Sequence, residues 1–275
     1  MDEWRFPSRA TPPGSAAYYS IRFAPSGLRD DLARLLGWRQ ALAAIPDTVS
    51  DPGVAQRKLD WWREEFAQML SGTPRHPLSR ALAPALDRHT LPPAPFLTIA
   101  ARAEAEIHRR VPADRAAVEA AEEEDRGALF ELLARCHGTA DSGLLVRARR
   151  LGGFCGQVER LRDAGRRLRA GRAVFAQDSL VAAGLAGTTL ERPDVRRRLA
   201  PLVAAAAAEA RDHGVAIDAS DLPVCLRIRA RLAERLLVEL TAPDANVVDT
   251  RIALTPLNKL WHAWRESRRR PPVRT

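Results

Sequence analysis

The sequence predicts an all-α protein, and three observations support this prediction. Alanine, leucine and arginine dominate the 275-residue chain, and these residue types favour helix. Alternating runs of β-branched residues are nearly absent, which argues against a sheet protein. Apolar residues recur at three- and four-residue steps in one block after another, as on helices with one buried face. With 46% hydrophobic residues, we expect a single helical domain around a buried core.

Helix boundaries are predicted from this periodicity and from the residues between the blocks. Asp51 followed by Pro52 offers an N-cap and a proline at the first helical position, and Thr255 with Pro256 repeats this arrangement. The segments "SGTPRHP" and "TLPPAP" are typical of turns. The predicted helices lie near residues 15–23, 28–45, 53–71, 76–89, 94–109, 113–137, 141–169, 194–213, 220–241 and 256–268.

Three of these helices carry apolar stripes with the spacing of one helix face. We expect the first two stripes to face the core. The stripes consist of Leu59, Trp62, Phe66, Met69 and Leu70; of Leu151, Phe154, Val158, Leu161 and Leu168; and of Leu257, Leu260, Trp261 and Trp264.

The third stripe has two interpretations, because two tryptophans share one face with basic residues opposite them. The favoured one is that Trp261 and Trp264 close the domain core. The alternative is that this helix meets a membrane surface or a partner helix.

The domain boundaries follow from composition. Residues 1–14 are predicted to form a flexible, proline-containing N-terminal arm, and residues 15–268 the helical domain. Residues 269–275 are expected to be a basic disordered tail.

Composition also excludes several classes of protein. The net charge of +9 comes from arginines interspersed with acids, and no nucleic-acid-binding motif is visible. Three widely separated cysteines fit a reducing compartment and predict neither a disulfide framework nor a zinc site. The sequence shows no signal peptide and no apolar run of membrane-spanning length, so we expect a cytoplasmic protein.

Two long segments carry a family resemblance. "YYSIRFAPSGLRDDLARLLGWRQALAAIPD" begins at Tyr18, and "VERLRDAGRRLRAGRAVFAQDSL" begins at Val158. Together with "LDWWREEF" and "LTPLNKLWHAW", they resemble the squalene/phytoene synthase family. The resemblance implies an isoprenoid-synthase helical bundle around a central cavity. It also implies two opposed aspartate-rich helices that bind Mg²⁺, so that a prenyl diphosphate can lose its diphosphate.

Both aspartate-rich motifs have lost acids. Where the family has aspartates in the first motif, this chain has Ala43, Ala44 and Asp47. In the second motif it keeps Asp163 but has Arg167. Pro46 is expected to end the first helix and turn Asp47 away from the cavity. Four residues from Asp163, Arg167 is expected to form an intrahelical ion pair with it. We therefore expect no metal ligands and no cofactor, with Mg²⁺ only if the protein is active.

The resemblance leaves candidate residues for substrate binding and two remnants of the motifs. Other potential sites are interpreted as structural: His76 as a cap or packing residue, "LGGFCGQ" as close helix packing, and the acidic run Glu122–Asp125 as a solvated helix face. The remnants are Asp47 and Asp163, and the candidate substrate-binding residues are Tyr19, Arg39, Arg162, Arg166, Arg167 and Arg172.

Three hypotheses for function follow. The first is a family member without head-to-head prenyl transfer, which holds an isoprenoid or other lipid or acts as an assembly or scaffold factor with a protein partner. The second is an active prenyltransferase that condenses two prenyl diphosphates and uses arginines such as Arg162, Arg166 and Arg167 in place of metal charge. The third is a basic protein peripheral to an anionic membrane.

Overall fold

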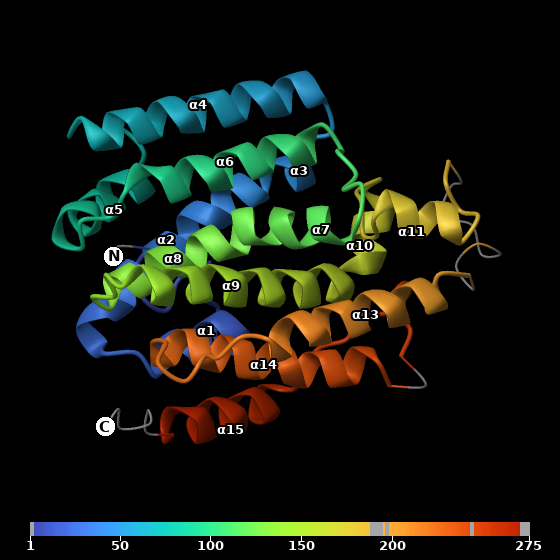
Figure 1. Cartoon of the computed structure of the whole chain (residues 1–275). Coiled ribbons are helices and arrows are strands. Elements are labelled where there is room, and N and C mark those ends of the chain that lie inside the picture. The colour runs from blue at the N-terminus through green and yellow to red at the C-terminus, as the bar shows by residue number, and fades with distance from the viewer. Residues whose placement is uncertain (1–2, 188–194, 196–197, 243–244, 270–275) are drawn as a thin grey trace.

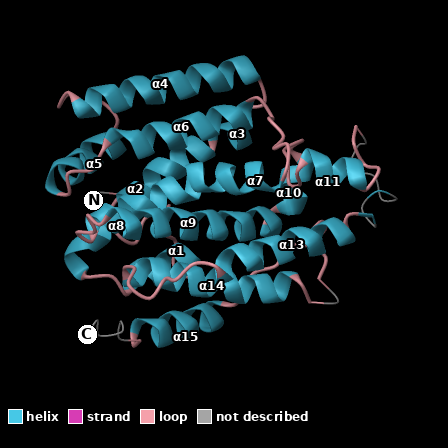
Figure 2. Ribbon diagram, viewed as in Figure 1, coloured by secondary structure: helices cyan, strands magenta, loops and turns pink. Residues whose placement is uncertain are grey.

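A computed structural model describes residues 3–187, 195, 198–242 and 245–269 of the chain (Figure 1). Within these ranges the protein is all-α, as predicted, and contains no strand (Figure 2). The helices are α1 (Ala16–Arg22), η1 (Ser26–Leu28), α2 (Arg29–Ala43), α3 (Ile45–Thr48), α4 (Pro52–Leu70), α5 (Pro77–Arg88), α6 (Pro93–Ile107), α7 (Arg115–Glu122), the π-helix η2 (Glu123–Gly127), α8 (Ala128–Cys136), α9 (Ser142–Arg162), α10 (Ala164–Arg169), α11 (Gln177–Ala182), α13 (Ala200–Val215), α14 (Val224–Leu240) and α15 (Pro256–Ser267).

Helix α9 lies at the centre of the bundle (Figure 1). On one side it packs against α7, η2 and α8, with α2 and α6 beyond them, and on the other side against α13 and α14. Helix α4 forms one outer edge over α5 and α6, and α15 forms the opposite edge over α14. This arrangement gives α9 two different buried faces.

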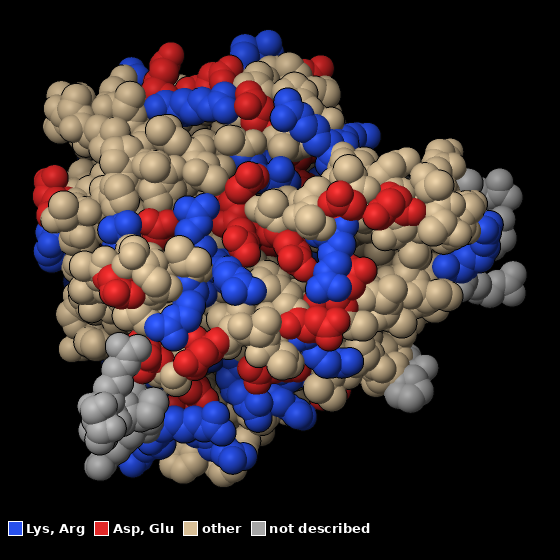
Figure 3. All heavy atoms as spheres, in the orientation of Figure 1, with Lys and Arg blue, Asp and Glu red and all other residues tan. Residues whose placement is uncertain are grey.

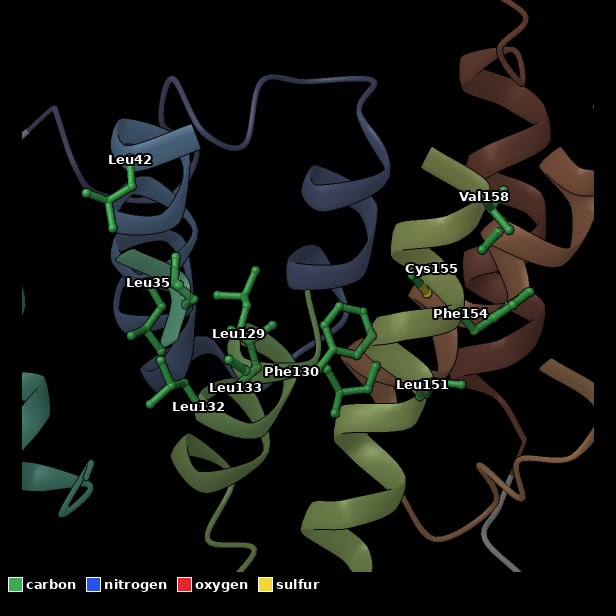
Figure 4. Close-up of a cluster of buried hydrophobic side chains, with 14 of the residues drawn as sticks. Leu35, Leu42, Leu129, Phe130, Leu132, Leu133, Leu151, Phe154, Cys155 and Val158 are labelled. Atoms are coloured by element: carbon green, nitrogen blue, oxygen red, sulfur yellow. The ribbon is translucent and has the colours of Figure 1, made fainter. Parts of the chain in front are cut away.

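The core is built from the predicted stripes. On α4, Leu59, Trp62, Phe66 and Met69 are buried, whereas Leu70 is exposed, contrary to the prediction. In Figure 4, Leu151, Phe154 and Val158 of α9 point toward the C-terminal helices, on the side of α9 opposite α8 and α2. The labelled members of this cluster are Leu35, Leu42, Leu129, Phe130, Leu132, Leu133, Leu151, Phe154, Cys155 and Val158.

Local capping explains where several helices begin. The Asp51 side chain accepts a hydrogen bond from Val54 N at 2.8 Å, and Thr255 does the same for Asn258 N at 3.3 Å. His76 caps α5, since its Nδ1 accepts a hydrogen bond from Leu78 N. The predicted caps and the structural interpretation of His76 are therefore confirmed.

Glycines bring α9 unusually close to η2. A Cβ placed on Gly152 would lie 2.4 Å from the carbonyl oxygen of Arg126 and 2.6 Å from Cα of Gly127. No side chain fits between the two backbones at this distance. The interpretation of "LGGFCGQ" as close helix packing is confirmed, and the contact fixes the acidic side chains of η2 against α9.

Two predicted long helices are interrupted. The helix predicted at 28–45 ends at Ala43, and the short α3 carries Asp47 beyond it. The helix predicted at 141–169 changes direction at Asp163, whose φ of −95° and ψ of 14° are not helical. Helix α11 was not predicted. The predicted start of the 194–213 helix lies partly outside the described residues, and α13 begins at Ala200.

Helix α15 contradicts the favoured interpretation of its stripe. Trp261 is 53% exposed and Trp264 is 41% exposed, so neither closes the core. Only Ala263 and Glu266 of this helix are buried, because α14 supports that opposite face. The predicted apolar stripe points outward.

The N-terminal segment lies against the bundle. Arg5 and the backbone of Phe6 donate hydrogen bonds to Asp30, and Thr11 is buried. The flexibility predicted for residues 1–14 stays a prediction, and residues 1–2 and 270–275 lie outside the described ranges. Within the described ranges, no helix combines the length and apolar character needed to cross a bilayer.

Candidate functional site

A pocket of about 130 Å³ lies between the remnants of the two aspartate-rich motifs. It is enclosed by α2, α3, α6, α7, η2, α9 and α10, and it is hereafter called the charged pocket. Its acidic lining residues are Asp47, Glu106, Glu122, Asp125, Glu159 and Asp163, and its basic lining residues are Arg39, Arg102, Arg126, Arg160, Arg166, Arg167 and Arg172.

Asp47 points into this pocket, which corrects the prediction that Pro46 turns it away. Its Oδ2 accepts a hydrogen bond from Arg166 at 2.7 Å, and its Oδ1 lies 2.5 Å from Nη2 of Arg172. Although Pro46 ends the long helix, α3 folds back toward α10 and keeps the carboxylate on the pocket side.

Asp163 is shared among three arginines. Arg162 donates two hydrogen bonds to it at 3.1 and 2.6 Å, Arg251 donates one at 2.9 Å, and Arg166 lies at 3.5 Å. Burial alone would raise the pKa of Asp163, but Arg162 and Arg251 outweigh it and hold the pKa below its ordinary value. The carboxylate is therefore ionised and fully occupied.

The predicted ion pair between Asp163 and Arg167 is wrong. Arg167 Nη2 instead lies 2.9 and 3.0 Å from the two carboxylate oxygens of Glu106 on α6. The i, i+4 geometry needs a continuous helix, and the chain leaves helical geometry at Asp163 between α9 and α10. Glu106 also lies 3.7 Å from Arg172.

Glu122 and Asp125 of the acidic run line the pocket, so the interpretation of the run as a solvated face is wrong for these two residues, whereas Glu124 is exposed. Glu122 accepts a hydrogen bond from Arg160 at 2.8 Å, and Asp125 accepts one from Arg39 at 2.8 Å. The π-helix adds a residue to this turn, which rotates the acids inward onto α9. For Asp125, burial raises the pKa, but the charge and hydrogen bond of Arg39 lower it more.

Glu159 joins the two faces of α9. One carboxylate oxygen accepts a very short hydrogen bond from Arg126, and the other accepts one from Arg229 at 2.6 Å. Burial opposes ionisation, yet Arg126 and Arg229 keep the pKa of Glu159 far below its ordinary value. Residues such as Glu106 and Arg229 gave no signal in the sequence, since their partners lie on other helices.

The donor set of the charged pocket does not fit a Mg²⁺ cluster. Magnesium needs carboxylate oxygens that are free to coordinate it in near-octahedral order. Here each of the six lining carboxylates already has a guanidinium partner. No three His, Cys, Asp or Glu side chains in the described part of the chain are grouped so as to hold a metal ion.

A second pocket, of about 190 Å³, lies on the other side of α9 and is hereafter called the apolar pocket. Helices α1, α9, α14 and α15 and the 251–254 segment enclose it, and Glu159 is its acidic lining residue. Its apolar lining residues are Ala16, Val158, Leu232, Ala233, Leu236, Ala253 and Leu254, and its basic lining residues are Arg162, Arg229, Arg251 and Lys259.

The candidate substrate-binding residues divide between these locations. Arg39, Arg166, Arg167 and Arg172 line the charged pocket together with both motif remnants. Arg162 lines the apolar pocket. Tyr19 is buried beside the Tyr18 ring and lines neither pocket. Their roles in binding stay predictions.

The fold is similar to those of solved squalene-type synthases. Squalene synthase HpnC from Alicyclobacillus acidocaldarius is 18% identical, with a TM-score of 0.63, covering 84% of this chain and 90% of that one. A dehydrosqualene synthase in complex with ligand is 16% identical, with a TM-score of 0.67 over 91% and 90%. The squalene synthase TcSQS, in complex with the ligand E5700, is 15% identical, with a TM-score of 0.64 over 91% and 82%.

Sequence comparison assigns the family. No curated protein matches the chain significantly. The profile of the squalene/phytoene synthase family, however, matches residues 11–258, which is most of the chain and includes both motif remnants. The chain therefore belongs to the squalene/phytoene synthase family.

Proposed function

We propose that this protein does not catalyse head-to-head prenyl transfer and instead holds an isoprenoid or a similar anionic lipid. The observation that carries the proposal is the pairing of all six carboxylates in the charged pocket with arginines. Loss of diphosphate from a prenyl chain needs positive charge that stabilises the departing group. In this pocket each carboxylate already holds an arginine, so these guanidinium groups are not free to receive a departing diphosphate.

Opening the pocket to metal would be costly. Asp163 would have to leave Arg162 and Arg251, and Asp47 would have to leave Arg166 and Arg172. For the largely buried pair of Asp163 and Arg162, removing one partner costs about 3–5 kcal/mol, because a charge stays buried without compensation. The half-exposed Arg166 and Arg251 contribute less, because water screens them. The network therefore resists both a metal cluster and a diphosphate that competes for the arginines.

The apolar pocket supplies the space for a lipid. Its wall of leucine, valine and alanine side chains suits a hydrocarbon chain. Arg162 and Arg251 pair with Asp163, and Arg229 pairs with Glu159, so Lys259 is the basic lining residue that suits an anionic head group. Lys259 donates a 3.0 Å hydrogen bond to the carbonyl oxygen of Gly14. Burial lowers the pKa of Lys259, and Arg162 and Arg251 lower it further. An anionic head group would relieve this mutual repulsion.

Turnover and binding can be tested separately with farnesyl and geranylgeranyl diphosphate. With Mg²⁺, we expect no diphosphate release and no hydrocarbon product. Release would show the alternative, an active prenyltransferase, and would refute the proposal. With a chelator instead of Mg²⁺, we expect calorimetry to detect binding of farnesyl diphosphate.

The site of binding is tested by a pair of variants. The double variant Arg251→Gln/Lys259→Gln should weaken binding, because it removes two cations from the rim of the apolar pocket. Lys58→Gln, at an exposed position of α4, is the matched control and should bind as the wild type does. If wild type binds no prenyl diphosphate, lipid holding is refuted and the assembly or scaffold role with a protein partner takes its place.

A further inference from the structure

Helix α15 presents an apolar face that no other part of the described chain covers. Leu257 is 79% exposed, and Leu260, Trp261 and Trp264 are also exposed on the same side of this helix. The two indole rings stack, with centroids 5.4 Å apart. Four large apolar side chains on one short helix form a contiguous outward patch, which is a mark of an interaction surface.

Arginines border this patch. The guanidinium of Arg265 lies 5.9 Å from the Trp261 ring centroid, and that of Arg268 lies 5.5 Å from the Trp264 ring centroid. Among residues 256–269, Glu266 is the only acid, and it is buried against Arg227 on the inner side. In Figure 3, acidic and basic atoms are interspersed over the centre of the molecule, whereas basic atoms gather along the lower edge, where α15 lies in Figure 1.

The neighbouring helix α14 adds to the positive charge. Burial lowers the pKa of His262, and the nearby Arg231, Arg235 and Arg265 lower it further. Glu234 of α14 pairs with Arg231 at 2.7 Å. The net charge of the side chains named around the patch is therefore positive.

We propose that α15 docks this protein on an anionic membrane surface, with its tryptophans and leucines in the head-group region and its arginines against lipid phosphates. Tryptophan is favoured at such an interface because its ring is apolar and its N–H is polar. An arginine beside the surface contributes electrostatic attraction to anionic lipids. The inner face of the helix stays fixed on the bundle through Ala263 and Glu266.

Vesicle sedimentation tests the docking surface. The full chain should bind vesicles of phosphatidylcholine containing phosphatidylglycerol, with weaker binding at high salt and little binding to phosphatidylcholine alone. Trp261→Ala/Trp264→Ala should weaken binding on the order of tenfold. Arg265→Gln/Arg268→Gln should weaken it about fivefold per arginine.

Matched controls lie on α4, at the opposite edge of the bundle. Trp61→Ala removes another exposed tryptophan, and Arg57→Gln removes another exposed arginine. Both should bind as the wild type does. Thermal unfolding of every variant separates a loss of docking from a loss of fold.

A direct reading comes from tryptophan fluorescence with brominated lipids. The variant Trp261→Phe/Trp264→Phe should still bind the vesicles, but the brominated lipids should quench its remaining tryptophan fluorescence much less than they quench that of the wild type. The proposal is overturned if the full chain binds no vesicles, if neutral vesicles bind equally well, or if the α15 variants bind like wild type. It is also overturned if the α15 patch proves to join two copies of the chain in sedimentation. Since no prenyl ligand is present, these outcomes are independent of the proposed lipid-holding function.

Discussion

The guanidinium of Arg167 is bound to Glu106, a residue 61 positions earlier in the chain, and not to Asp163 on its own segment. This contact ties α10 to α6 across the charged pocket. A position that holds an acid in the metal-binding motif of the family thus holds a cation with its own carboxylate partner. With seven arginines and six carboxylates in its lining, the pocket needs no metal to compensate its acids.

Reversing the charge at this position should destabilise the fold and restore no activity. In Arg167→Asp, two carboxylates would face each other in a pocket where Glu106 is 20% exposed. We expect a loss of about 3–5 kcal/mol in the free energy of unfolding, measured by urea denaturation. Arg110→Asp makes the same charge change at an exposed position and should cost less than about 1 kcal/mol. A stable Arg167→Asp variant that forms a prenyl product would contradict both expectations.

Stability should fall in acid because buried carboxylates are ionised in the folded state. The pKa values of Glu106, Asp125 and Asp163 are lowered, since arginines outweigh the effect of burial. Groups with a lowered folded-state pKa contribute their stabilisation above the unfolded-state pKa and lose it as pH falls through the folded-state value. The free energy of unfolding should therefore be steady at neutral pH and decline below about pH 4.

A single substitution tests the source of this acid sensitivity. Asp125→Asn removes one ionised carboxylate and leaves Arg39 without it, so the variant should be less stable at neutral pH but lose stability less steeply in acid. Asp87→Asn, at an exposed position, should follow the wild-type curve. If the free energy of unfolding falls with pH equally steeply in Asp125→Asn and in wild type, the ion pair between Asp125 and Arg39 does not contribute to the acid sensitivity.

The close contact between α9 and η2 should not tolerate a methyl group. In Gly152→Ala the new Cβ would meet the backbone of Arg126 and Gly127, so one helix must move. Overpacking of this kind costs about 1–3 kcal/mol or more. Gly27→Ala is the control, because a Cβ there meets nothing within 4 Å. Circular dichroism melts of the two variants should differ clearly, and equal melting temperatures would refute the tight contact.

The cysteines should be inert while the protein is folded. Burial raises the pKa of Cys155 and of Cys225 to about 12 and raises that of Cys136 as well. Because the thiolate is the reactive form, almost none of it is present near pH 8. A colorimetric thiol reagent should label no cysteine in native protein and all three after denaturation. Rapid labelling of the native chain would show that these side chains are accessible.

The fold was predictable because its signals are local. The apolar stripes of α4 and α9, the Asp51 and Thr255 caps and the glycines of α9 act over one or two helical turns, and apart from the exposed Leu70 they have the expected structural role. The break at Pro46 was also visible, since proline cannot continue a helix without losing a hydrogen bond.

The site was less predictable because its contacts are not local. Whether Arg167 pairs with Asp163 or Glu106 depends on where α6 lies, and sequence spacing does not contain that position. The inward rotation of Asp125 depends on a single π turn that has no sequence signature here. The prediction that the α15 stripe closes the core failed for a related reason. The spacing of apolar residues shows which of them share a helix face, but it does not show whether that face turns inward.

Glu159 gives the molecule a property that neither pocket has alone. One of its carboxylate oxygens binds Arg126 on one side of α9, and the other binds Arg229 on the opposite side. A single carboxylate therefore lines both the charged pocket and the apolar pocket. An anion that draws Arg229 away leaves Glu159 with Arg126 as its partner and alters the field around the opposite network. Binding of an anion in the apolar pocket would therefore change the charge distribution around the charged pocket through Glu159.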